Sequence, residues 1–105
     1  MAQFDVFPNP NARTRDAYPF LVDIQSPVIA ELATRIVIPL APASALKGGT
    51  LFGLTPEVSY QGQALLLMTP QLSSVPAKIL NNPIGSLEHF RTEIIAAIDF
   101  AITGF

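Results

Sequence analysis

Short, mainly hydrophobic runs recur over the first 80 residues of the chain, and in the first of them Phe4 and Val6 alternate with Asp5. These runs are rich in β-branched and aromatic residues and are separated by Pro, Gly and Asn, a pattern typical of β-strands. The fourth and fifth runs are predicted to form a hairpin around Gln61-Gly62. We expect strands at residues 3–7, 18–25, 34–40, 56–60, 63–69 and 73–80. The pattern therefore predicts an antiparallel sheet or small barrel.

The ten prolines support these boundaries. Most of them, Pro39 and Pro42 included, are expected at or between segment ends, where a residue without a backbone N–H is tolerated. Pro76 lies inside its run and therefore indicates an edge or bulged strand. Residues 42–49 are expected to hold one helical turn, and residues 81–85 a loop.

From Leu87 onward the apolar spacing becomes that of a helix. At about 100° per residue, six apolar residues fall on one stripe roughly 80° wide, which should face the sheet. Ser86 is the expected N-cap, Glu88 suits the positive end of the helix, and Gly104 marks its end. The stripe consists of Leu87, Phe90, Ile94, Ile98, Ala101 and Phe105.

The same helix has apolar residues outside this stripe. Ile95 and Ile102 flank it, Asp99 and Thr103 follow further around, and Phe100 falls on the side expected to be wet. An apolar flank that runs into polar residues is typical of an exposed contact patch. The alternative is a wider core, because apolar arcs of about 100° or more are normal for helices of globular domains. The pattern alone leaves both open.

The composition indicates that the surface of the protein carries few charged residues. Half of the 105 residues are hydrophobic and only 13% are charged, against about 25% in ordinary soluble domains. The simplest explanation of the low charge content is that a second subunit covers part of the surface; the alternative is a surface that is merely uncharged.

The length predicts a single domain over residues 1–105. The net charge is −2, and among Lys and Arg only Arg13 and Arg15 cluster, which argues against direct nucleic-acid binding.

The compartment follows from what the chain lacks. There is no cysteine, so disulfides and thiolate sites are excluded. The N-terminus has no basic and apolar regions of a secretory signal, and no stretch of about 18 residues is apolar enough to span a membrane. We therefore expect a soluble cytoplasmic protein that does not bind membranes.

Residues for catalysis are scarce as well. His89 is the only histidine, and no motif positions a serine beside it as a nucleophile. A weak surface pair with Glu93, one turn later, is the simpler interpretation of His89. The stretch KGGT at residues 47–50 lacks the P-loop pattern, and the carboxylates are dispersed. The sequence thus predicts binding, with no catalytic residue, cofactor or metal.

Several stretches together resemble the CcdB family, the toxins of plasmid and chromosomal toxin–antitoxin modules that poison DNA gyrase. They are FLVDIQS (20–26), RIVIPL (35–40), MTPQLSSVPAKIL (68–80) and EIIAAIDFAITGF (93–105), and QFDVF (3–7) also fits. Each stretch alone is a generic β or helical run. Their common order and spacing over nearly the whole chain, together with SSVP, carry the resemblance.

The resemblance implies a mainly β fold: a small SH3-like antiparallel barrel or sheet, related to the MazF and Kid toxins, closed by a C-terminal helix. It implies a homodimer that binds the gyrase A subunit, traps the cleaved gyrase–DNA complex and catalyses nothing. Such a topoisomerase poison is neutralised by a cognate, CcdA-like antitoxin through coupled folding and binding. Toxin and antitoxin then act as transcriptional co-repressors of their own operon, and on plasmids such modules serve plasmid maintenance.

The resemblance also assigns gyrase-binding residues by position, and this chain departs from the family at two places. Thr103 stands where the best-known members have Trp, and Pro27 where an acidic residue is common. Thr103 removes an aromatic anchor and puts gyrase affinity in doubt. Two alternatives therefore stay open: a MazF/Kid-type ribonuclease, or a homologue that binds an antitoxin without poisoning gyrase. The residues implied to bind gyrase are Val28, Ile29, Asp99, Ile102, Thr103, Gly104 and Phe105.

Overall fold

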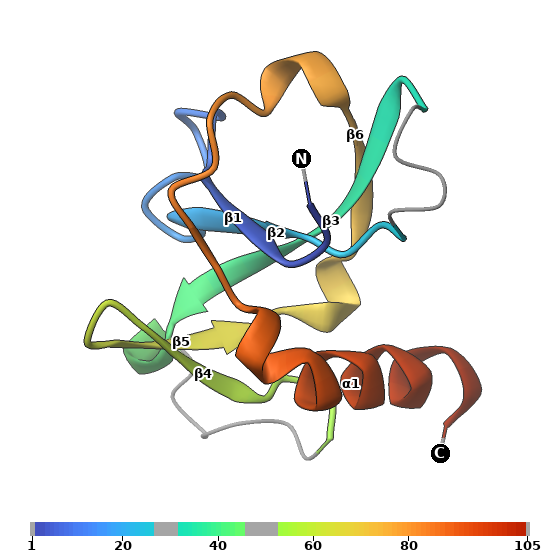
Figure 1. Ribbon diagram of the computed structural model, residues 1–105. Coiled ribbons are helices and arrows are strands. Elements are labelled where there is room, and N and C mark those ends of the chain that lie inside the picture. Colours follow the sequence, from blue (N-terminus) through green and yellow to red (C-terminus); the bar gives the residue numbers. More distant parts are fainter. Residues whose placement is uncertain (1, 27–31, 46–52, 105) are drawn as a thin grey trace.

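The computed structural model describes residues 2–26, 32–45 and 53–104 (Figure 1). In this part of the chain the strands curl into one antiparallel sheet, and the C-terminal helix α1 (Arg91–Thr103) lies against it. The strands are β1 (Asp5–Pro8), β2 (Phe20–Asp23), β3 (Thr34–Pro42), β4 (Glu57–Tyr60), β5 (Gln63–Leu67), β6 (Ser73–Pro76) and β7 (Gly85–Ser86). The 3-10 turns are η2 (Ala43–Ala45), η3 (Thr69–Gln71), η4 (Ala77–Ile79) and η5 (Glu88–Phe90). The predicted mainly β fold with a terminal helix is confirmed.

The long strand β3 is the centre of the sheet. The strand order is β4-β5-β3-β2-β1-β7, and one edge of β3 is shared by β5 and β6. Pro39 lies inside β3, so its predicted place at a strand end was wrong. Its carbonyl accepts the Met68 N–H (3.0 Å) at the point where the chain leaves β5. The N–H and C=O groups of one strand residue point to the same side of the strand. The position where Pro39 lacks an N–H therefore faces the break between β5 and β6.

The β4–β5 hairpin turns where the sequence predicted. Gln61 and Gly62 have φ values of 52° and 75°, and Tyr60 pairs with Gln63 across the turn. Positive φ at both central residues is the requirement of a type I′ turn, whose twist matches that of the strands. The strand β6 lies off the main strand order and pairs with β3, which agrees with the predicted edge strand. It ends at Pro76, opposite Thr34, and residues 77–79 form the 3-10 turn η4, so the prediction of one strand over residues 73–80 was wrong.

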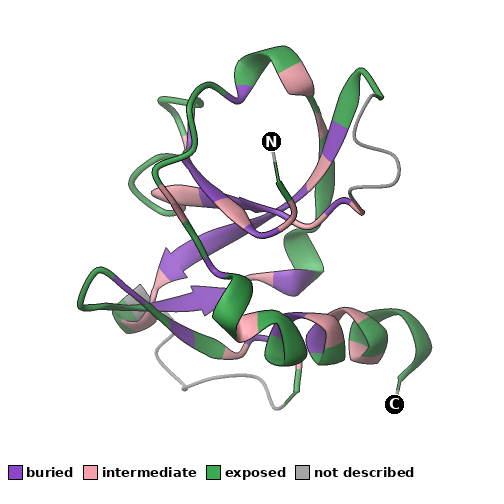
Figure 2. Ribbon diagram, in the orientation of Figure 1, coloured by how far each residue is buried: buried purple, intermediate pink, exposed green. Residues whose placement is uncertain are grey.

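Many residues of the central strands are buried (Figure 2), and their apolar side chains form two clusters, one on each face of the sheet. Neighbours such as Leu21 and Val22 belong to two different clusters of buried residues, because successive strand residues point to opposite faces. The larger cluster includes Ile94 and Ala97 of α1. The smaller one contains Phe7, Leu21, Val37 and Leu80. Burial on both faces explains why these strands have continuous rather than alternating hydrophobic runs.

The helix begins later than the pattern predicted. Residues 88–90 form the 3-10 turn η5, and α1 starts at Arg91. Ser86 does not cap α1, whose N-cap is Phe90; the Ser86 hydroxyl oxygen instead accepts the N–H of Glu88 (3.1 Å), the first residue of η5. Gly85 and Ser86 pair with β1 as the short strand β7, although a loop was expected at residue 85. Leu87 is fully buried, as expected of the stripe.

Three apolar residues of α1 lie differently from the prediction. Ala101 is exposed, and Ala97 is buried at 1% exposure. Phe100, expected on the wet side, is half-buried with its ring against Gly53, where an added Cβ would lie 3.3 Å from Cδ2 of the ring. The segment that leads into β4 therefore covers a helix side that the pattern assigned to solvent. Figure 2 shows the burial fading toward the last helical turn, which the sheet no longer covers.

A buried ion pair joins the end of β2 to β3. Asp23 is fully buried and Arg35 is 1% exposed, and the guanidinium contacts Asp23 Oδ2 through Nε (2.8 Å) and Nη2 (2.6 Å). The other carboxylate oxygen accepts the Gln25 N–H (3.0 Å). The side-chain oxygen of Gln25 in turn accepts the Ile36 N–H (3.1 Å). This network fixes the backbone that precedes residue 27.

Candidate partner-binding site

The last turn of α1 presents apolar and polar groups to solvent. Ile102 is 75% exposed, the largest exposure among the large hydrophobic residues of the described chain. Asp99, Thr103 and Gly104 are exposed around it. The periodicity predicted that Asp99, Ile102 and Thr103 lie outside the core stripe, and their exposure agrees with that prediction. An isoleucine so far out of the core loses the burial free energy of about 1.5–3 kcal/mol that such a side chain can gain.

Gly104 ends the helix as predicted. Its φ of 80° is in the left-handed region, which costs little for glycine, and its N–H donates to the Phe100 carbonyl (2.9 Å). An added Cβ at Gly104 would meet nothing within 4 Å. The chain therefore leaves the helix over an open surface, and a larger residue here would project into solvent.

Hydrogen bonding and charge define the polar part of this turn. The Thr103 hydroxyl donates to the Asp99 carbonyl (2.6 Å), which holds that side chain back along the helix. Asp99 brings a carboxylate to the negative end of the helix dipole, and no basic residue occupies the last turn. That placement costs about 0.3–1 kcal/mol by the usual dipole effect. A cationic group of a partner would relieve this cost.

The exposed turn is held in place by the packing that precedes it. Ile94 is fully buried and Ala97 nearly so, while Ile95 and Ile98 pack half-buried against the same cluster. The Phe100 ring on Gly53 adds a second anchor on another side of the helix. The last turn is thus a short projection from a fixed element, and such a surface loses little conformational entropy on binding.

The structure brings four of the seven residues implied to bind gyrase together at the C-terminal end of α1. These are Asp99, Ile102, Thr103 and Gly104. The other three, Val28, Ile29 and Phe105, lie outside the described residues.

The remaining chemistry of the described chain is modest. His89 is exposed, with its ring 4.5 Å from that of Phe90, and the described contacts include no ion pair between His89 and Glu93. Within residues 2–26, 32–45 and 53–104, no three acidic or histidine side chains gather as metal ligands would. No helix in those ranges is long and apolar enough to cross a bilayer. What the last turn of α1 offers is apolar contact area and one carboxylate.

The fold is that of a small β protein: a curled antiparallel sheet with a C-terminal helix packed against it. The exposed last turn of this helix is a surface suited to contact with another protein. Comparison with known protein families matches residues 3–104 to the family described as CcdB protein. The match covers nearly the whole chain, and the protein therefore belongs to the CcdB family. It is a toxin of a toxin–antitoxin system.

Proposed function

We propose that this toxin binds the A subunit of DNA gyrase and traps the cleaved gyrase–DNA complex, so that the break is not resealed. The observation that carries the proposal is the exposed last turn of α1, with Ile102 at 75% exposure beside Asp99 and Thr103. Family membership supplies the partner, since gyrase poisoning is the known activity of CcdB proteins. In this proposal the protein is a binding partner of gyrase and catalyses no reaction.

The contact chemistry proposed is an apolar centre with a charged rim. Ile102 would lose its exposed surface against gyrase, and Asp99 would meet a cationic group there. Val28, Ile29, Gly104 and Phe105 complete the proposed surface.

Thr103 bears on the strength of this contact. A buried aromatic anchor at an interface centre can contribute several kcal/mol, and Thr103 stands where the best-known relatives carry Trp. A second candidate function follows from this one residue: a homologue that binds its antitoxin but no longer poisons gyrase. The MazF/Kid-type ribonuclease lacks a comparable observation, because the net charge is −2 and His89 is exposed without a described partner carboxylate.

The wider biology belongs to the same proposal. The chain acts as a single domain and as a homodimer, whose second subunit accounts for the low charge content of the surface. A CcdA-like antitoxin neutralises it in the cytoplasm by folding onto it. The two proteins together repress their operon, with the antitoxin providing the DNA contacts. We expect the neighbouring gene to encode a short protein with a basic N-terminal half and an acidic C-terminal half.

The proposal is tested by incubating the purified protein with gyrase, supercoiled DNA and ATP, followed by denaturant and protease. Linear DNA should accumulate. RNA cleavage in a parallel reaction without gyrase would establish the ribonuclease instead. If neither occurs while the neighbouring gene product binds tightly, the protein is an antitoxin-binding homologue.

Matched variants test the proposed site in the same assay. Gly104→Glu should abolish linear DNA without unfolding the protein, and Thr103→Trp should increase it. Gly62→Glu is the control, since Gly62 also has a positive φ (75°) and open space around an added Cβ, but lies in the β4–β5 turn. Equal activity of Gly104→Glu, Thr103→Trp and the parent protein would refute the site assignment.

A further inference from the structure

The pairing of β2 with β3 ends at a point where side chains replace backbone groups. The last paired residues are Asp23 and Val37, and the register would next pair Ile24 with Ile36. The Ile24 N–H does donate to the Ile36 carbonyl (2.9 Å). In an antiparallel pair that exchanges both bonds, the reciprocal bond would join the Ile36 N–H to the Ile24 carbonyl. Both of these groups bind glutamine side chains instead.

Two glutamines thus complete what we call the β2–β3 break. The Ile36 N–H donates to Gln25 Oε1 (3.1 Å), and the Ile24 carbonyl accepts a hydrogen bond from Gln3 Nε2 (3.2 Å). A continued ladder would pair the two backbone groups without any side chain. The two amides therefore let the chain leave β2 while both backbone groups keep a hydrogen-bond partner, which avoids the penalty for an unpaired buried group.

Gln25 is held through its backbone as well as its side chain. It is 2% exposed, and its N–H donates to Asp23 Oδ1 (3.0 Å). The other oxygen of that carboxylate contacts the buried Arg35 guanidinium. Burying a glutamine costs rotamer entropy and desolvation of the amide, which an apolar residue of similar size would avoid. Buried polar groups that are kept in spite of this cost can fix one arrangement of the chain.

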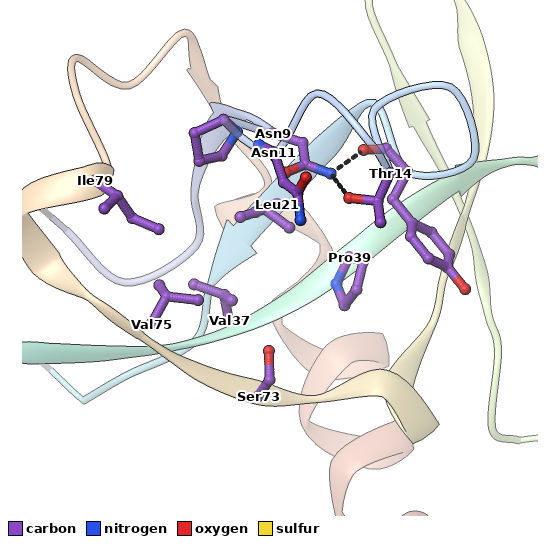
Figure 3. Close-up of a pocket in the computed structure, with 11 residues that line it drawn as sticks. Asn9, Asn11, Thr14, Leu21, Val37, Pro39, Ser73, Val75 and Ile79 are labelled. Carbon is purple, nitrogen blue, oxygen red and sulfur yellow. Dashed lines mark hydrogen bonds between the residues drawn. The ribbon is translucent and has the colours of Figure 1, made fainter.

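The strand β3 is the fixed side of the break. Its pairing with β6 continues as far as Thr34, opposite Pro76. Figure 3 shows Val37 of β3 beside Val75 of β6, with Leu21 of β2 next to them, at one wall of a cavity of about 220 Å³ between the β1–β2 loop and β6. Because β6 holds β3 beyond the break, the break releases the chain that follows β2 and leaves β3 in the sheet.

We propose that Gln25 is a positioning residue for gyrase binding. By ending the β2–β3 pairing with a side chain, it sets the point at which the chain leaves β2 ahead of Val28 and Ile29, two residues of the proposed gyrase surface. Gln25 is buried, so it acts through the segment that follows it and does not touch gyrase. A preorganised surface loses less conformational entropy on binding, so loss of the Gln25 bond weakens the gyrase complex. This inference rests on the proposed function.

The test is the affinity of the full-length protein for the purified gyrase A subunit, measured by surface plasmon resonance. Gln25→Met keeps the size of the side chain but removes the amide acceptor of the Ile36 N–H, and it should lower the affinity at least about fivefold. If Gln25→Met does not fold, Gln25→Asn replaces it, because its shorter side chain draws the amide oxygen away from Ile36.

Gly85→Ala is the control for stability. It destabilises β7 by overlap of the new Cβ with Tyr60, and it should leave gyrase affinity within about twofold of the parent. Thermal melts should show both variants folded at the temperature of the binding measurement. An equal loss of affinity with Gly85→Ala and the Gln25 variant would mean that affinity follows stability, and would overturn the proposal.

A double-mutant cycle separates positioning from a general effect on the fold. In a background of Val28→Ala with Ile29→Ala, Gln25→Met should change gyrase affinity less than about twofold, because the positioned side chains no longer contribute. In an Ile102→Ala background it should cost as much as in the parent. Equal costs in both backgrounds would overturn the proposal and leave the proposed function intact. No binding of gyrase by the parent protein would refute the proposed function itself, and this inference with it.

Discussion

Replacing Asp23 with Asn keeps the shape of a fully buried side chain and removes its charge. The change removes the carboxylate that Arg35, itself 1% exposed, contacts through Nε and Nη2 at 2.8 and 2.6 Å. Exposed ion pairs contribute about 0–1 kcal/mol, but removing one partner of a buried pair costs about 3–5 kcal/mol. A domain of this size has a free energy of unfolding of about 5–15 kcal/mol, so Asp23→Asn should remove a large part of it.

Urea denaturation followed by circular dichroism measures this cost. With a slope of about 2 kcal/mol/M, the midpoint should fall by roughly 2 M. Asp16→Asn is the control, because Asp16 is exposed and its variant should stay within about 0.5 kcal/mol of the parent.

A double-mutant cycle sharpens the test. Arg35→Met alone should be as damaging as Asp23→Asn, because it leaves the carboxylate uncompensated. The double variant has neither charge, and the amide oxygen introduced by Asp23→Asn can still accept the Gln25 N–H that Asp23 Oδ1 accepts now (3.0 Å). It should therefore be more stable than the sum of the single losses by about 1–3 kcal/mol. Additive losses, or a loss below about 1 kcal/mol for Asp23→Asn, would refute the inference that these charges depend on each other.

Three further predictions concern packing and pH. Gly85→Ala should lower the free energy of unfolding in urea by about 1–3 kcal/mol, since the new Cβ would overlap the Tyr60 hydroxyl oxygen; no loss would refute the close approach. Burial raises the pKa of the Tyr60 hydroxyl above 10.0, so the folded state binds the proton more tightly. Stability should be full below pH 10.0 and fall as the pH rises above it, and Tyr60→Phe should remove that fall while costing about 1 kcal/mol for the lost bond to the Ile84 carbonyl (2.8 Å). An unchanged slope in the Phe variant would contradict this. Phe100→Ala should cost about 2 kcal/mol by uncovering Gly53, and a neutral effect on the urea midpoint would mean that the ring is not an anchor.

Much of the fold follows from local patterns. Runs of β-branched and aromatic residues predicted the strand positions, and Gln61-Gly62 predicted the hairpin. Both signals depend only on residues that are close together in the sequence. The start of α1 did not follow, since the 3-10 turn before Arg91 depends on pairing of residues 85–86 with β1. The place of Pro39 inside β3 was missed for a similar reason: the break between β5 and β6 that accommodates it is formed by distant segments.

The candidate site, too, could be predicted from the sequence only in part. Helical periodicity alone placed Asp99, Ile102 and Thr103 outside the core stripe, because it depends only on the turn angle of the helix. It misplaced Phe100, since only the tertiary structure shows that Gly53 lies over that side of the helix. The cavity between the β1–β2 loop and β6 had no sequence signal, because its walls come from segments far apart in the chain.

The central claim is that the exposed last turn of α1 makes this toxin a gyrase poison. The most direct measurement is the amount of linear DNA formed by gyrase with the parent protein, with Ile102→Glu and with Ile84→Glu. Ile84 is the control, as another exposed isoleucine at 43% exposure, remote in sequence from α1's last turn. We predict that the parent protein and Ile84→Glu accumulate linear DNA and that Ile102→Glu, still folded, does not. Equal linear DNA with Ile102→Glu, or none with the parent protein, would contradict the claim.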